Sequence, residues 1–325
     1  MSRYFLGVDV GSSKTHALIA DEKGNTLGFG RGGAGNHEGV GYEGLEKALQ
    51  ESTSQALAMA DLKVAQVSGA GFGVAGYDWP SEREPTLRSI ATLGLLCLVE
   101  AVNDVDIGLL AGTHEGWGLV IDAGSGNNVR GRTPAGRVAG ITGCGVRFGE
   151  YGGSSELVQR ALVAITYAWT HRGPPTLLTQ IFLQHVGAAD IVEFLEGLEL
   201  DRYFLESEMA PLVFQAAEAG DAVAQEVITW NSRELGHSAV GIIRQLGFQN
   251  LDFEIVLIGS MFNGGPLSTE PMKQVIWDEA PGARFVRLNC EPVVGGVLLG
   301  MQTAGLDPRP IHARLVENSN LLSLR

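Results

Sequence analysis

Short apolar runs separated by small and polar residues open the chain and predict buried strands. Residues 4–8 form such a run, and residues 15–20 and 26–30 have the pattern of two further strands joined to it by tight turns. Because the connecting turns are short, the three segments are expected to pair as an antiparallel meander. Further strands are predicted at residues 64–71 and 98–102.

Helical periodicity appears between and after these strands. Residues 43–60 carry apolar residues along one helical face, and residues 88–96 predict a shorter helix. A buried strand is predicted at residues 254–258, and the rest of the chain beyond residue 154 is mostly helical in pattern. The helices expected there span residues 155–171, 207–219, 221–246 and 293–304. Strands and helices combined in this way favour an α/β fold.

A strand that ends in an aspartate and a glycine turn occurs twice. Asp9 ends the first strand and is followed by the turn at residues 11–13, Gly-Ser-Ser. Asp122 ends a later apolar strand and is followed by the turn at residues 124–126, Gly-Ser-Gly. The repetition predicts a chain built from two similar halves.

The length agrees with two units. At roughly 150 residues per domain, 325 residues correspond to about two domains. We place the units at residues 1–115 and 116–325, with the boundary near the glycine-containing segment 112–116. The last helix is a candidate for packing back on the first unit.

Composition and charge argue against nucleic acid and against a membrane as partners. The net charge is −14 and the 23 lysines and arginines are scattered, whereas a duplex-binding surface needs clustered positive charge. The most apolar stretch, residues 93–102, contains Glu100 and falls far below the roughly 20 residues that span a bilayer. Neither nucleic acid nor a membrane is therefore expected as a partner. The widely spaced Cys97, Cys144 and Cys290 favour a reducing cytoplasm over a disulfide framework or a zinc site.

The two glycine turns indicate phosphate binding. Small residues let backbone N–H groups approach a polyphosphate, and Ser or Thr hydroxyls add donors. Two ordinary hairpin turns are the alternative, but their joint occurrence and a third Gly-Ser turn at residues 259–260 favour a nucleotide site. The Gly-x-Gly-x-x-Gly segments at residues 30–35 and 71–76 carry little weight, because 45 glycines make chance matches expected.

These three turns resemble the two phosphate motifs and the adenosine motif of the actin-like, hexokinase-like ATPase superfamily. Within it the chain most resembles the N-acetylglucosamine kinase family, through residues 35–37, 103–104, 143–145 and 149–154. The resemblance extends over about residues 7–300. It implies two α/β domains of the actin-like (ribonuclease H-like) type, each with a mixed five-stranded sheet, and a cleft between them for ATP and sugar.

The resemblance also assigns a nucleotide site. ATP would be bound by Gly11, Ser12, Ser13, Lys14, Thr15, Gly124, Ser125, Gly126, Asn127, Gly259 and Ser260. Asp9 would orient Mg²⁺ through water, with Asp122 as a second candidate. The cofactors implied are therefore ATP and Mg²⁺.

Asp104 is the expected catalytic base. It follows the predicted strand 98–102, and open α/β sheets bind their ligands at the carboxyl ends of strands. By resemblance it would accept the proton of the sugar C6 hydroxyl. Asp106 is the competing candidate, although a helix is expected to begin there and Asp is favoured in first helical turns.

The sugar site is implied by the same resemblance. Its residues would be Asn36, Asp104, Gly143, Cys144, Gly145 and Glu150. Two of them depart from the family: Cys144 stands where the family has Trp, and Glu150 stands where it has Asp. The longer Glu moves its carboxylate by about 1.5 Å. Both departures bear on which sugar is bound more than on the class of reaction.

The function expected is transfer of the γ-phosphoryl group of ATP to the 6-hydroxyl of an amino sugar, with N-acetylglucosamine as first choice, by a cytoplasmic homodimer. The nearest alternative is a kinase of glucosamine or another hexose. An activator ATPase related to the 2-hydroxyacyl-CoA dehydratase activators would need cysteines placed for an iron–sulfur cluster between subunits, and Cys97, Cys144 and Cys290 match no such motif. A non-catalytic sugar sensor is the third alternative.

Overall fold

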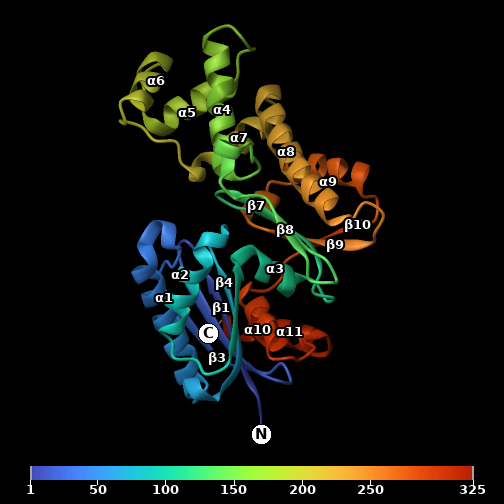
Figure 1. Ribbon diagram of the computed structural model, residues 1–325. Coiled ribbons are helices and arrows are strands. Elements are labelled where there is room, and N and C mark those ends of the chain that lie inside the picture. The colour runs from blue at the N-terminus through green and yellow to red at the C-terminus, as the bar shows by residue number, and fades with distance from the viewer. Residues whose placement is uncertain (1, 324–325) are drawn as a thin grey trace.

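Two mixed five-stranded sheets organise the chain, of which the computed structural model describes residues 2–323 (Figure 1). The first sheet has the order β3-β2-β1-β4-β5, with β1 to β3 antiparallel and β4 and β5 parallel to β1. Its strands are β1 (Tyr4–Val10), β2 (Thr15–Asp21), β3 (Thr26–Gly32), β4 (Val67–Val74) and β5 (Leu98–Asn103). The predicted α/β fold and the predicted meander are confirmed.

Successive side chains of the central strand β1 point to opposite faces of the first sheet, and both faces are covered by helices. Leu6, Val8 and Val10 of β1 pack with α1, whereas Phe5 packs with α10. In Figure 1, α1 and α2 lie on one side of this sheet and α10 and α11 on the other. These helices are α1 (His37–Met59), α2 (Arg83–Ala91), α10 (Val293–Thr303) and α11 (His312–Ser323).

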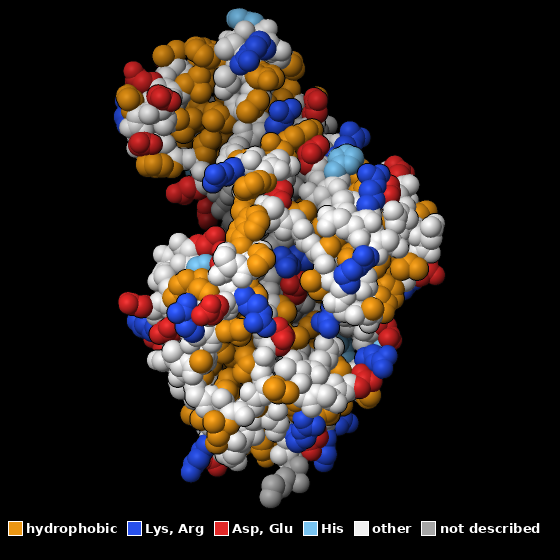
Figure 2. All heavy atoms as spheres, viewed as in Figure 1, with side chains coloured by type: hydrophobic (Ala, Val, Ile, Leu, Met, Phe, Trp, Pro, Cys, Tyr) orange, Lys and Arg blue, Asp and Glu red, His pale blue; other side chains and the backbone are white. Residues whose placement is uncertain are grey.

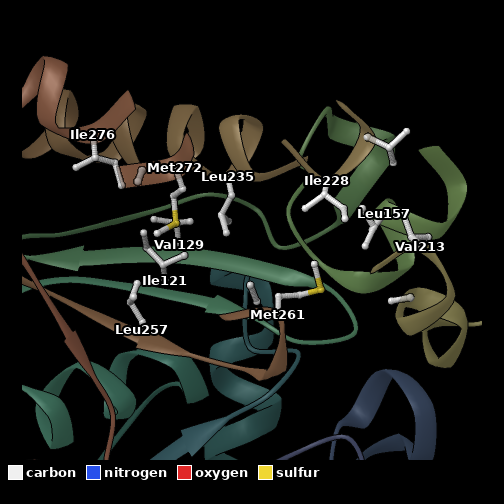
Figure 3. Close-up of a cluster of buried hydrophobic side chains, with 14 of the residues drawn as sticks. Ile121, Val129, Leu157, Val213, Ile228, Leu235, Leu257, Met261, Met272 and Ile276 are labelled. Atoms are coloured by element: carbon white, nitrogen blue, oxygen red, sulfur yellow. The ribbon is translucent and has the colours of Figure 1, made fainter. Parts of the chain in front are cut away.

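The second sheet has the order β10-β9-β6-β7-β8 and is covered on one face by α8 and α9. Ile121 and Val129 point from the sheet toward these helices, where Leu235 and Met272 complete one buried cluster (Figure 3). The elements are β6 (Gly118–Ala123), β7 (Asn127–Arg132), β8 (Val138–Gly140), β9 (Phe253–Ile258), β10 (Ala283–Arg287), α8 (Ala222–Leu246) and α9 (Pro266–Glu279).

Four further helices rise above the second sheet at the top of Figure 1. They are α4 (Ser154–Trp169), α5 (Leu177–Val186), α6 (Ile191–Glu199) and α7 (Ala210–Glu218). They pack on one another and, through α4 and α7, on α8. Figure 2 shows the surface hollowed between this upper part and the first sheet below it.

Helix α3 (Asp104–Gly112) lies between the two sheets. Its Val105 and Leu109 pack on the second sheet, beside Val256 of β9. Its Ile107 packs with Leu299 of α10, the helix that covers the first sheet. The first residue of α3 therefore lies where the two halves of the molecule meet.

Most expected elements are present with shifted ends. Helix α1 starts at His37, where Asn36 caps it by accepting a hydrogen bond from the Glu38 N–H at 3.0 Å. A kink at Gly41, with a φ of 69°, separates this first turn from the longer part of the helix, whose start agrees with the expected residue 43. The helix expected at 88–96 is wrong in position, since α2 ends at Ala91. The strands β7, β8 and β10 and the helices α5, α6 and α9 were not anticipated, although α5 and α6 carry clear apolar patterns.

The carboxyl-terminal helices return to the first half. Both α10 and α11 pack on the first sheet although they follow the second sheet in sequence. The division of the chain at residues 115 and 116 stays a prediction. Within residues 2–323, no helix is both long enough and apolar enough to cross a membrane.

We expect Gly71→Ala to destabilise the protein by about 1–3 kcal/mol, the usual cost of forcing extra volume into a packed interior. A Cβ at Gly71 of β4 would overlap the carbonyl oxygen of Gly296 and lie 2.7 Å from the Leu299 Cβ in α10. Urea unfolding measures the change. Gly241→Ala is the matched control, because nothing lies within 4 Å of a Cβ there. Equal stability of both variants and the wild type would contradict close packing of α10 on β4.

Candidate active site

Three aspartates from both halves lie together where the sheets meet. Asp9 is near the carboxyl end of β1, Asp122 is near that of β6, and Asp104 is the first residue of α3. Burial raises the pKa of Asp104 well above its usual range, and the negative charges of Asp9 and Asp122 raise it further. The three predicted carboxylates therefore lie within electrostatic range of one another, and we refer to them as the carboxylate cluster.

Burial also dominates the titration of the other two aspartates. It raises the pKa of Asp9 to about 6, although the positive charges of His16 and Lys14 oppose the shift. It raises the pKa of Asp122 to about 6 against the opposing charge of Arg287. Without a bound cation, the cluster therefore retains protons at a pH where an exposed Asp would be fully ionised.

The donor set of this cluster fits magnesium held through water. Carboxylate oxygens are ligands that Mg²⁺ prefers, and Mg²⁺ usually keeps several of its water molecules in proteins. Among the described residues, no three His, Cys, Asp or Glu side chains are arranged to hold a metal ion directly. Indirect coordination is the mode that was expected for Asp9.

The first glycine turn presents free backbone donors. The Gly11 N–H donates to the Lys14 carbonyl at 2.9 Å and closes the turn between β1 and β2. In the part of the chain that the structure describes, the N–H groups of Ser12 and Ser13 have no partner. The Thr15 hydroxyl, by contrast, donates to the Gly33 carbonyl at 2.9 Å, so this side chain holds the turn in place.

The second glycine turn is docked on the start of α4. The Ser154 and Ser155 N–H groups donate to the Gly124 and Ser125 carbonyls, each at 2.9 Å. The Gly124 N–H donates to the Gly126 carbonyl at 2.9 Å, which leaves the N–H groups of Ser125 and Gly126 without a partner among the described residues. Free N–H groups beside the positive end of a helix suit an anion.

The side chain of Asn127 lies behind this second turn. Its Nδ2 donates to the Glu156 Oε2 at 3.4 Å, while its Oδ1 is buried and has no partner among the described atoms. Glu156 also accepts a hydrogen bond from the Gly153 N–H at 2.8 Å. Asn127 therefore contacts a buried carboxylate at the base of the turn.

A large pocket joins the second turn to the expected adenosine motif. Its volume is about 970 Å³, and Ser125, Ser207, Phe214, Ser260 and Gly264 contribute to its lining. Gly259 precedes it with a φ of 102°, where a Cβ would overlap the Ala123 carbonyl, so only glycine fits. Of the predicted nucleotide residues of the second half, Ser125 and Ser260 line this pocket.

Asn36 links the first turn to the expected sugar site. Its Oδ1 caps α1, and its Nδ2 donates to the Ser12 Oγ at 3.1 Å. A Cβ at Gly76, in the loop after β4, would overlap the Asn36 Oδ1. The hydrogen bonds to Ser12 and to the start of α1 therefore fix the Asn36 side chain next to the loop that leads to Asp78.

Asp78 connects this loop to α3 and to the second half. Its carboxylate accepts a hydrogen bond from the Asn103 Nδ2 at 2.9 Å, next to Asp104. A Cβ at Gly143 would lie 3.8 Å from the Asp78 Oδ1 and 3.1 Å from the Asn128 Nδ2. The Gly143–Gly145 backbone thus lies beside the residues that surround Asp104.

The two departures in the sugar loop have different environments. Cys144 is exposed, so the packing role that is usual for a lone Cys does not apply to it. Glu150 is 7% exposed, and its carboxylate accepts hydrogen bonds from the Thr142 N–H at 2.7 Å and the Thr142 hydroxyl at 3.0 Å. Glu150 is therefore a fixed, buried carboxylate and not a solvated one.

The Asp106 carboxylate forms an ion pair with Arg130. The Arg130 Nε donates to the Asp106 Oδ2 at 2.9 Å, and both side chains are largely buried. The pair faces a second pocket of about 380 Å³, which Tyr77 and Asn103 also line. As the partner of a buried arginine, Asp106 is a poorer proton acceptor than Asp104.

The family of the chain follows from its sequence match. The model of the BadF/BadG/BcrA/BcrD ATPase family matches residues 6–300. The chain belongs to this family. That its two glycine turns bind the nucleotide stays a prediction.

Two relatives of this ATPase span nearly the same length. An N-acetylmuramic acid/N-acetylglucosamine kinase of Clostridium acetobutylicum is 23% identical over 300 residues, covering 91% of this chain and 98% of its own. An N-acetyl-D-glucosamine kinase of Dictyostelium discoideum is 24% identical over 314 residues, covering 92% and 98%. They confirm the resemblance to N-acetylglucosamine kinases that the motifs predicted.

Solved structures share the fold. A Chromobacterium violaceum protein assigned as an N-acetylglucosamine kinase has a TM-score of 0.65 at 23% identity, over 91% of this chain and 98% of its own. A ROK family glucokinase from Streptomyces griseus, in complex with glucose and AMPPNP, has a TM-score of 0.57 at 18% identity, over 93% and 100%. The predicted two-sheet architecture is therefore one that sugar kinases use.

The sequence interpretation missed two acidic residues, Asp78 and Glu291. Asp78 follows the carboxyl end of β4, so the rule that selected Asp104 would also have found it. Glu291 lies before α10, 3.8 Å from the Lys14 Nζ and 3.4 Å from the His16 Nδ1. No local pattern marks Glu291, because its partners are far away in sequence.

Arg287, at the end of β10, was also missed. It donates to the Gly259 carbonyl at 2.6 Å and to the Asn263 Oδ1 at 3.3 Å, and its positive charge opposes the rise that burial causes in the pKa of Asp122. Arg287 therefore braces the turn of the adenosine motif in this ATPase and places a cation near the carboxylate cluster.

We expect Asp122→Asn to raise the stability of the ligand-free protein at pH 7 by about 1–3 kcal/mol, since one pKa unit corresponds to about 1.4 kcal/mol. The folded-state pKa of Asp122, about 6, lies above the ordinary value of 3.8. The stability gained by protonating Asp122 in the folded protein is thus complete below about pH 4 and is lost as the pH rises through 6. Urea unfolding at several pH values measures this, with the largest gain at pH 7. A variant less stable than the wild type at pH 7 would refute the electrostatic account.

Proposed function

We propose that this ATPase is a kinase that transfers the γ-phosphoryl group of ATP to the 6-hydroxyl of an amino sugar, with N-acetylglucosamine as the first candidate. The observation that carries the proposal is the position of Asp104. Its partly buried carboxylate stands with Asp9 and Asp122, where α3 meets both sheets. The names of the two relatives support the choice of substrate.

The nucleotide would occupy the second half. Its adenosine part fits the pocket of about 970 Å³ bounded by Ser125 and Ser260. Its phosphates would run along the free N–H groups of Ser125 and Gly126 toward those of Ser12 and Ser13. This path leads from the pocket to the carboxylate cluster, where the γ-phosphoryl group is needed.

Asp104 is the proposed general base. As the sugar O6 attacks the γ-phosphorus, the new O–P bond forms, the bond to the ADP oxygen breaks, and Asp104 takes the hydroxyl proton. Phosphoryl transfer depends mainly on positioning and charge stabilisation, so Asp104 also aligns the hydroxyl. Mg²⁺, held through water by Asp9 or Asp122, would supply positive charge to the transferring phosphoryl group.

The sugar would lie between Asn36 and the Gly143–Glu150 segment. The Glu150 carboxylate keeps unused lone pairs beyond its two bonds to Thr142, so it can accept from sugar hydroxyls. Asp78, beside Gly143, is a further acceptor in the same region. Mg²⁺ dependence, a homodimer and a cytoplasmic location remain predictions, as does the division into residues 1–115 and 116–325.

An ADP-release assay over a panel of sugars tests the proposal. We expect ADP release with ATP, Mg²⁺ and N-acetylglucosamine, and little release without sugar, because the attacking hydroxyl would then be missing. Glucosamine, N-acetylmannosamine and glucose distinguish the amino-sugar kinase from a hexose kinase. Sugar-independent ATP turnover would favour an activator ATPase, and sugar binding without turnover would favour a sensor.

Asp104→Asn should lower kcat at least about 10²-fold, the lower end of the range for general-base catalysis, because it removes the proton acceptor but keeps the shape. Binding of ATP and sugar, measured by calorimetry, should persist. Asp106→Asn is the control. It should keep most of kcat but lower stability by about 3 kcal/mol, because it leaves the buried Arg130 guanidinium unpaired. A near-normal kcat in Asp104→Asn would instead move the role of base to Asp106.

Glu150→Gln should weaken binding of N-acetylglucosamine by roughly 10- to 100-fold, since a charge-assisted hydrogen bond contributes about 1.5–3 kcal/mol. ATP binding should stay near normal, because Glu150 faces the Thr142 loop. Glu150→Asp restores the side chain that the resemblance implies and should be milder, or should bind this sugar better. Calorimetric titration of both variants decides. Unchanged affinity in Glu150→Gln would leave Glu150 as a purely structural brace of Thr142.

A further inference from the structure

A second pocket lies away from the carboxylate cluster, between α4 and α8. Its volume is about 250 Å³, close to the lower end of the range for small-molecule sites. Its polar lining comes from Arg160, Arg172 and Glu226, and Tyr167 and Trp230 add aromatic surface. It shares no lining residue with the large pocket beside the second glycine turn.

The guanidinium groups of the two arginines in this pocket stack on aromatic rings and form no ion pairs with carboxylates of residues 2–323. The Arg160 guanidinium carbon lies 4.7 Å from the Trp230 ring centre, and that of Arg172 lies 4.3 Å from the Tyr167 ring centre. Within the described part of the chain, no carboxylate forms an ion pair with either arginine.

These groups define the chemistry of a ligand. The Arg172 Nε donates to the Thr170 hydroxyl at 2.9 Å. A guanidinium stacked on a ring can still offer its remaining N–H groups to a phosphate or carboxylate. Glu226, on the same rim, can accept hydrogen bonds from hydroxyl or amide N–H groups. Val163, Ala164 and Val227 offer an apolar wall. A small phosphate ester that carries hydroxyls, an amide and a methyl group satisfies all three surfaces.

The pocket is connected to the sugar side of the active site. The Trp230 ring contacts the Tyr151 ring edge-on, with 4.8 Å between the ring centres. Tyr151 directly follows Glu150, the carboxylate fixed by Thr142. Helix α4, which carries Arg160, begins at the Ser154 and Ser155 N–H groups that bind the second glycine turn. A ligand that moves Trp230 or α4 would thus act on both substrate sites.

We propose that Arg160 and Arg172 form a regulatory site for a phosphorylated amino sugar, the class of molecule that the reaction releases. The choice of ligand rests on the proposed function, whereas the anion site rests on the pocket alone. The product would bind with its phosphate on the two guanidinium groups and its hydroxyls toward Glu226. Its effect would pass through Trp230 and Tyr151 to Glu150.

Calorimetry on the full chain tests the site directly. N-acetylglucosamine 6-phosphate is titrated while saturating N-acetylglucosamine and AMPPNP occupy the active site. Arg160→Gln and Arg172→Gln should each raise its Kd about 10- to 100-fold, as expected for loss of a charge-assisted hydrogen bond. Arg233→Gln removes one exposed arginine from α8 outside this pocket and should match the wild type. An unchanged Kd in both pocket variants overturns the proposal, and equally tight binding of inorganic phosphate overturns the choice of a sugar phosphate.

Product inhibition provides the second readout. Without added product, both pocket variants should keep the wild-type kcat and KM, because neither arginine touches a substrate. With product, the wild type should show inhibition that excess sugar does not relieve, and the variants should lose that component. Identical inhibition in wild type and variants counts against regulation. If no sugar is phosphorylated, the proposed function fails, but the calorimetric comparison still decides whether these arginines bind the phosphate ester.

Discussion

Helix α3 packs closely on both halves of the molecule because a glycine leaves room at each contact. A Cβ on Gly295 of α10 would overlap the Ile107 carbonyl of α3, and a Cβ on Gly108 of α3 would overlap the Ile258 side chain of β9. These two close approaches tie α3 to the first half through α10 and to the second half through β9. Asp104 is the first residue of α3, so its position relative to both sheets is set by packing. A carboxylate that must contact groups from two sheets has to be carried by an element that packs on both.

The same packing of α3 brings three negatively charged aspartates together, which lowers stability. Asp104 lies partly buried near Asp9 and Asp122, and the mutual repulsion raises a pKa that burial already raises. In the ligand-free protein such a cluster lowers stability near neutral pH, because the charged forms are poorly solvated. A cation or a cation-bearing nucleotide would relieve this repulsion. The cluster is thus unfavourable for folding alone and favourable for binding, which is a common property of functional sites.

Sequence patterns predicted what is local and missed what depends on contacts between distant segments. Asp9, Asp104 and Asp122 were predicted because each stands near or just after the carboxyl end of a buried strand, where α/β sheets bind their ligands. Asp78 obeys the same rule and was available to it. Glu291, in contrast, reaches Lys14 and His16 from the far end of the chain, and no spacing rule describes such a contact.

Burial was the second quantity that the sequence left open. Glu150 between two glycine-rich segments has the pattern of a solvated loop residue, yet Thr142 holds it inside the protein. Cys144, a residue type that is usually buried, lies on the exposed part of the same loop. Whether a loop residue faces inward depends on the fold of the whole loop, which residue type alone does not determine.

That loop explains how sugar recognition is divided in the proposed kinase. Gly143, Gly145 and Gly149 have φ values of 73°, 64° and 74°, so the exposed segment is bent at three glycines, while Glu150 at its end is fixed. An aromatic residue at position 144 would give the exposed segment a surface for the sugar ring, and Cys144 does not. The loop would then contribute backbone groups and the anchored Glu150 carboxylate. Discrimination between sugars would accordingly depend more on polar groups held by the first half, Asn36 and Asp78, than on stacking.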